Sequence, residues 1–163
     1  MQRIVWLSVI AQVCLASCAM RSSTEIDNRR AEQFAMEKGR LSELTDPVEI
    51  ARCQITISRI LLEFAASGLA QRDSDGANRR IAQYTASIQA ARNAMTGSGV
   101  NPLQKPAGYS DLVTATGDYA RFLESMRSAL PQDQQSTLNS AREITDSIRS
   151  EMLRLLSTRI VDD

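Results

Sequence analysis

The sequence predicts an all-α protein, an up-down helical bundle of four long helices plus a looser N-terminal helix. In four separate segments, apolar residues recur at three- and four-residue spacing, which is the periodicity of one helix face. Turn-forming residues separate these segments, and no β-type alternation reaches a useful length. Three of the predicted connections are short, and short connections favour antiparallel neighbours. A single helical domain over residues 24–163 is therefore expected.

The first two helices differ in how well they are defined. A helix over residues 24–42 carries only a weak apolar stripe. The second helix begins at Asp46-Pro47, which supplies an N-cap and a proline at the first helical position, and it ends between Gly68 and Gln71. Two adjacent apolar stripes predict that it is buried among its neighbours: Val48, Ala51, Ile55, Ser58, Leu62, Ala65 and Leu69, beside Ile50, Ile57, Ile60, Leu61 and Phe64.

Three further helices follow. The third is predicted over residues 76–95, with Asp75 as its N-cap, and Gly97-Ser98-Gly99 ends it. A long connection, residues 96–109, leads to a fourth helix over 111–129 that Ser110 is expected to cap. Pro131 marks a tight corner, and the last helix is predicted over 132–159. Bundle connections usually have about 2–8 residues, so the segment 96–109 is unusually long.

The first 17 residues read as an export signal rather than as part of the folded domain. Arg3 is followed by an apolar run from Ile4 to Ala16, interrupted only by Ser8 and Gln12. Apolar cores of about 7–15 residues are typical of signal peptides, whereas a membrane-spanning helix needs about 20. The segment therefore predicts a signal peptide over residues 1–17.

The end of this segment, Leu15-Ala16-Ser17-Cys18, resembles the lipobox of bacterial lipoproteins. The resemblance covers only residues 1–18. It implies cleavage before Cys18, lipid on that residue, and residues 18–23 as a short tether to the membrane. Ala19, in place of an aspartate, implies export to the outer membrane, with the domain facing the periplasm. The alternative is an ordinary signal peptide that is cut at another small-residue site.

Composition excludes several classes of function. The chain has no histidine, which removes the usual general base and most zinc and haem sites. Loss of Arg3 with the signal leaves 18 basic residues of the 19 against 19 acidic ones. Such a balance gives no basic field for nucleic acid. No cofactor, metal site or catalytic residue is predicted, and any membrane attachment is expected to come from lipid on Cys18 rather than from charge.

Three smaller features have two readings each. Cys53 has no predicted intramolecular partner, so it is either a small buried side chain or the site of an intermolecular disulfide. Asp73-Ser74-Asp75-Gly76 resembles part of a calcium loop but lacks carboxylates at both ends of that loop, which favours a turn with a helix cap. The connection 96–109 is either a packed connector or an interaction loop presenting Pro102, Lys105, Pro106 and Tyr109.

The sequence therefore predicts a non-enzymatic envelope lipoprotein whose helical domain binds another envelope protein as an adaptor. The alternative is a small helical enzyme or ligand-binding bundle that acts on cell-wall or lipid material. That alternative predicts a concave pocket in which two or more carboxylates converge beneath the surface.

Overall fold

The computed structural model describes residues 25–102 and 104–157, which form helices and connections without a β-strand. The all-α prediction is confirmed. The predicted signal peptide, its box Leu15-Ala16-Ser17 and the lipidation residue Cys18 lie outside the described residues.

The chain divides into two units after Ala35. A helix over residues 25–41 runs across this boundary, and none of its residues is buried. This agrees with the looser N-terminal helix that its weak apolar stripe predicts. The second unit contains the four long helices, α2 to α5, and is described by itself below.

Helix α2, Pro47–Ala70, begins where the sequence predicts. The Asp46 carboxylate accepts hydrogen bonds from the backbone N–H groups of Val48, at 2.7 Å, and Glu49, at 3.3 Å. These two bonds lower the pKa of Asp46, because they stabilise its charged form. Both predicted stripes contribute buried side chains, so this helix is covered on more than one side: Val48, Ala51, Cys53, Ile57, Ser58, Ile60, Leu61, Leu62 and Ala65.

Helix α3, Ser74–Thr96, begins two residues before its predicted start, and the prediction of Asp75 as its N-cap is wrong. Asp73 caps the helix by accepting a hydrogen bond from the Gly76 N–H at 2.9 Å. The turn before it is tight because Arg72 adopts a left-handed backbone conformation, with φ of 62°. A side chain at Gly76 would place its Cβ 1.9 Å from the Asp73 carboxylate, so glycine leaves room for the cap. The turn-and-cap reading of residues 73–76 is confirmed.

Helix α4, Pro106–Ser128, begins five residues before its predicted start, and the predicted cap at Ser110 is wrong. Pro106 occupies the first turn, where the missing N–H of proline costs no hydrogen bond. Gly108 lets this turn approach α3, because a Cβ there would lie 2.7 Å from the Met95 side chain. The connection between α3 and α4 is therefore residues 97–105, shorter than predicted.

The last predicted helix is divided in two. A short 3-10 helix, η1 (Gln132–Gln134), follows Pro131, and α5 (Ser136–Ser157) begins after Gln135. The side chain of Gln135 donates to the Leu130 carbonyl at 2.8 Å and so holds the corner together. The prediction of one continuous helix from residue 132 is wrong at this corner, and predicted residues 158–159 lie outside the described part of the chain.

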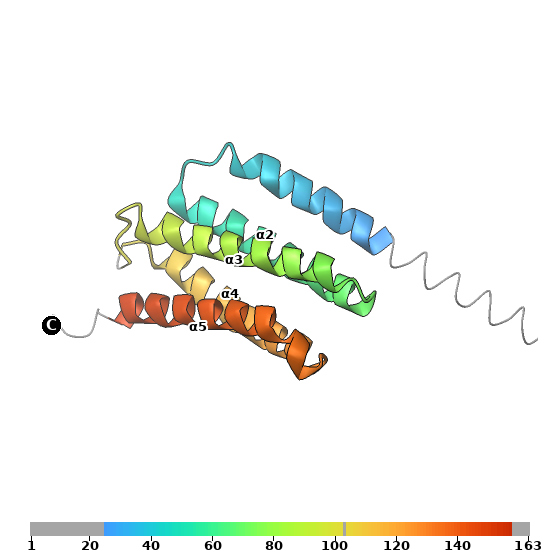
Figure 1. Cartoon of the computed structure of the whole chain (residues 1–163). Helices are drawn as coiled ribbons and strands as arrows, with labels where there is room; N and C mark the ends of the chain where they lie inside the picture. Colours follow the sequence, from blue (N-terminus) through green and yellow to red (C-terminus); the bar gives the residue numbers. More distant parts are fainter. Residues whose placement is uncertain (1–24, 103, 158–163) are drawn as a thin grey trace, which may run out of the picture. The chain divides into compact units, whose positions relative to one another are not determined.

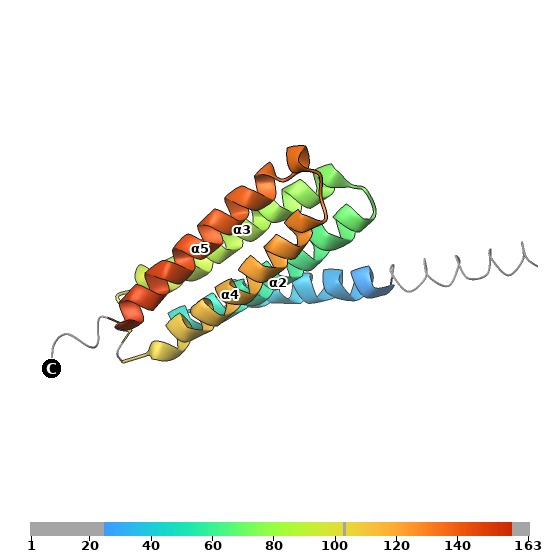
Figure 2. The same ribbon diagram turned by 90° about the horizontal axis from the view of Figure 1, so that it is seen from below.

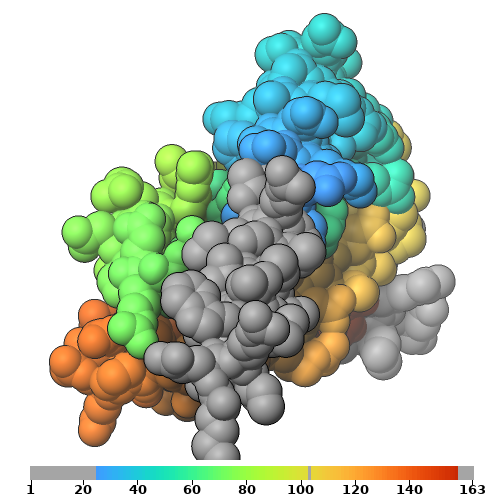
Figure 3. Space-filling view, turned by 90° about the vertical axis from the view of Figure 1, so that its right-hand side faces the viewer, coloured from blue at the N-terminus to red at the C-terminus, as the bar shows by residue number. Residues whose placement is uncertain are grey.

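The four helices alternate in direction along the chain and form two αα-hairpins, α2–α3 and α4–α5 (Figures 1 and 2). The α2–α3 corner and the corner between α4 and α5 lie at the same end of the bundle (Figure 3). Between hairpins, α2 packs on α4 and α3 packs on α5, and both of these neighbouring pairs run parallel. The connection 97–105 therefore joins helices on opposite corners of the bundle, which explains why it is longer than the hairpin turns.

Two tyrosines bind the hairpins together in the core. The Tyr84 hydroxyl of α3 lies 2.7 Å from the Thr145 hydroxyl of α5, and the Tyr119 hydroxyl of α4 donates to the Ile55 carbonyl of α2 at 2.7 Å. The two rings meet edge to face, 5.8 Å apart at an interplanar angle of 84°. Because each hydroxyl has one partner in the opposite hairpin, these bonds favour the observed pairing of helices.

One buried hydroxyl has no such partner. Ser58 in α2 is fully buried, and its Oγ makes no hydrogen bond within the described structure. We expect Ser58→Ala to raise the free energy of unfolding by up to about 1 kcal/mol, because an unpaired buried hydroxyl is removed. Chemical denaturation measures the change.

The matched control for Ser58→Ala is Thr145→Val, which removes a paired hydroxyl. It should lower the free energy of unfolding by about 1–3 kcal/mol, because the Tyr84 hydroxyl loses its partner. If Ser58→Ala destabilises the protein as much as Thr145→Val does, the Ser58 hydroxyl is bonded in solution.

Candidate functional site

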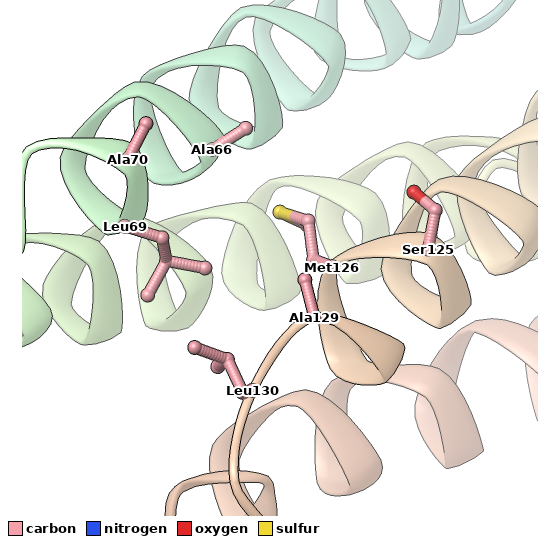
Figure 4. A pocket seen from close by; sticks show the side chains of 7 residues that line it. All are labelled: Ala66, Leu69, Ala70, Ser125, Met126, Ala129 and Leu130. Carbon is pink, nitrogen blue, oxygen red and sulfur yellow. The ribbon is translucent and has the colours of Figure 1, made fainter.

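An apolar groove opens between the C-terminal ends of α2 and α4 (Figure 4). Its volume is about 420 Å³, within the range of about 300–1,000 Å³ that is usual for ligand pockets. Three residues of α2 form one wall, and the end of α4 with the residues that follow it forms the other. The lining residues are Ala66, Leu69, Ala70, Ser125, Met126, Ala129 and Leu130.

The groove is shaped by small side chains on both walls. Alanines at 66, 70 and 129 leave space between two helix ends that run parallel. Leu69, Met126 and Leu130 supply its larger apolar surface. The groove therefore offers shape and apolar contact to another molecule.

The chemistry of the groove is limited to apolar contact. Its lining contains no acidic, basic or sulfhydryl side chain. The hydroxyl of Ser125 already donates to the Phe122 carbonyl at 2.7 Å. Phe122 lies one helical turn before the lining residue Met126, and 37 % of its surface is exposed. Because residues four apart share a helix face, Phe122 adds apolar surface on α4 beyond the groove. Such a surface suits an aliphatic or aromatic group better than a charged one.

The four residues of the predicted interaction loop do not form one exposed surface. Pro102 lies in the connection and is half-buried, whereas Lys105 is the exposed N-cap residue of α4 and lies 3.5 Å from the Asp46 carboxylate. Pro106 is exposed but belongs to the first turn of α4. The ion pair of Lys105 with Asp46 joins the start of α4 to the start of α2.

The prediction that Tyr109 presents its ring to a partner is wrong. Tyr109 is only 2 % exposed, and its hydroxyl lies 3.1 Å from the Met95 carbonyl and 2.7 Å from the Val100 carbonyl. Burial raises the pKa of this hydroxyl. These bonds tie the first turn of α4 to the end of α3 and to Val100 in the connection, as expected of a packed connector.

Cys53 is a buried side chain, as one of its two readings predicts. It is 1 % exposed, and its Sγ lies 3.3 Å from both the carbonyl and a carboxylate oxygen of Glu37. Burial is the main cause that raises the pKa of the thiol to about 11, and the nearby Glu37 carboxylate is the second cause. A buried thiol that stays protonated is a poor nucleophile and a poor candidate for an intermolecular disulfide.

We expect Cys53 to be unreactive in the folded protein. In a chain without residues 1–17 that carries Cys18→Ala, Cys53 is the sole thiol. An aromatic disulfide reagent at mildly alkaline pH should modify it slowly, and the rate should rise at least tenfold in denaturant. Equal rates in both conditions would contradict the buried position.

Charged side chains form ion pairs between helices rather than a reactive cluster. Arg92 of α3 binds Glu151 of α5 through two bonds, of 2.8 and 3.0 Å, and Arg52 of α2 lies 2.8 Å from Asp111 of α4. In each pair the carboxylate raises the pKa of the arginine. Within the described residues no acidic or basic side chain is buried. The buried side chains that carry a polar group are serines, threonines, tyrosines and a cysteine: Ser58, Ser87, Thr116, Thr145, Tyr84, Tyr109, Tyr119 and Cys53.

Nowhere in 25–102 and 104–157 do three cysteine, aspartate or glutamate side chains come together as metal ligands. None of the helices there combines the length and the hydropathy that a bilayer span requires.

The groove is a feature that the sequence did not reveal. Periodicity assigns Ala65 and Leu69 to a buried face, but it does not show that two helix ends leave a space beside them. Alanines at 66, 70 and 129 are the pattern that could have indicated it, although alanine is also the commonest helix former.

The chain has no match among protein-family models, curated proteins or solved structures.

Proposed function

We propose that this chain is a non-enzymatic lipoprotein of the cell envelope, exported and anchored through lipid on Cys18, whose helical domain binds another envelope protein as an adaptor. The lipobox resemblance of Leu15-Ala16-Ser17-Cys18 supports the anchor, and Ala19 in place of an aspartate favours the outer membrane, with the domain facing the periplasm. Stable anchoring by lipid usually requires more than one acyl chain, which lipoproteins of this class carry.

The observation that carries the binding role is the apolar groove between α2 and α4. A surface without charged groups, next to the partly exposed ring of Phe122, is typical of a site that receives apolar side chains of a partner protein. The two parallel helix ends form the walls of this contact surface.

The second candidate, an enzyme or ligand-binding bundle acting on cell-wall or lipid material, requires carboxylates that converge in a concave pocket. The groove has no carboxylate in its lining, and the acidic side chains of the described helices are at least partly exposed. These observations favour the adaptor over the enzyme.

The binding role is tested by cross-linking in cells that express the native chain, Ala66→Glu or Ala82→Glu. Ala66 lines the groove in α2, whereas Ala82 is an exposed residue of α3 outside the groove lining, so the second variant adds the same charge elsewhere. We expect Ala66→Glu to reduce capture of a specific protein at least tenfold, because a carboxylate in the groove must lose its water on binding. Ala82→Glu should leave capture unchanged.

If the two variants capture the same proteins in the same amounts, the groove is not the binding surface. Far-ultraviolet circular dichroism of both purified variants shows whether each is folded. If no variant and no native chain captures a specific protein, the adaptor role is wrong.

The anchor is tested separately, by the intact mass of the mature N-terminus. The native chain should begin at Cys18 and carry the mass of its lipid, and Cys18→Ala should carry none. A native chain that begins at another residue would support an ordinary signal peptide. In that case the domain would act without a membrane anchor.

A further inference from the structure

We draw no further inference here: the strongest candidate, the apolar groove between the C-terminal ends of α2 and α4, belongs to the site already described, and nothing in the described part of the chain shows which molecule covers it.

Discussion

Replacing Tyr84 with alanine should lower the free energy of unfolding by about 3–5 kcal/mol, the usual cost of removing a large buried aromatic ring. Tyr84 is fully buried in α3, contacts the Tyr119 ring edge to face and bonds Thr145 of α5. A domain with a total stability of about 5–15 kcal/mol would lose a large part of it. Denaturant unfolding followed by circular dichroism measures the loss.

Tyr84→Phe separates the ring from its hydroxyl. It keeps the edge-to-face contact and should cost only about 0.5–1.5 kcal/mol, because one neutral hydrogen bond is lost. Thr145 still lies 2.8 Å from the Ala141 carbonyl and keeps a partner. Equal losses for the alanine and phenylalanine variants would show that the ring contributes little, which would contradict its central position between the hairpins.

Raising the pH above 10 should unfold the protein and ionise its tyrosines in one transition. The three tyrosines of the chain are Tyr84, Tyr109 and Tyr119, and all are buried. Burial is the main cause that raises the pKa of each hydroxyl above the ordinary value of 10.0. In the folded protein these groups therefore keep their protons at a pH where the unfolded chain loses them.

The direction in which stability changes with pH follows from proton linkage. Above pH 10 the unfolded state binds fewer protons than the folded state, so stability falls as the pH rises. Each tyrosine that stays protonated in the folded state contributes about 1.4 kcal/mol of lost stability for every pH unit above that value. Cys53, with its thiol pKa raised from 9.0 to about 11, adds to the same loss between about pH 9 and 11.

Tyrosinate absorbance and far-ultraviolet circular dichroism, recorded together during an alkaline titration, check this expectation. The two signals should change at the same pH, because the hydroxyls ionise only when the helices unfold. Tyrosinate that forms near pH 10 while the helices remain intact would show that at least one hydroxyl is open to solvent.

The existence and order of the four long helices could be predicted from the sequence, because each of them buries one face. The start of α2 was also predictable, since Asp46-Pro47 combines a side-chain acceptor with a proline that needs no N–H partner. The starts of α3 and α4 were less predictable. Asp73 and Asp75 are equally good caps in sequence, and in the structure the left-handed residue Arg72 is followed directly by the cap at Asp73.

The pairing of helices and the groove could not be read from periodicity. A stripe of apolar residues shows that a face is buried, but it does not say which helix covers it. Here the choice depends on contacts between distant residues, such as Tyr119 with Ile55. The same limit applies to Tyr109. In the predicted long connection its aromatic ring could be either exposed or buried, and only its hydrogen bonds to the Met95 and Val100 carbonyls show that it is buried.

The connection 97–105, which joins helices on opposite corners of the bundle, divides the chain into two hairpins, and this division affects how the chain folds. Each hairpin is made of neighbouring segments, so its contacts are local and form at a small loss of chain entropy. Contacts between hairpins, such as Tyr84 with Thr145, join residues 61 positions apart. We therefore expect the folding nucleus to lie within a hairpin and docking of α2–α3 on α4–α5 to come later, so a mutation at the junction of the hairpins should accelerate unfolding more than it slows folding.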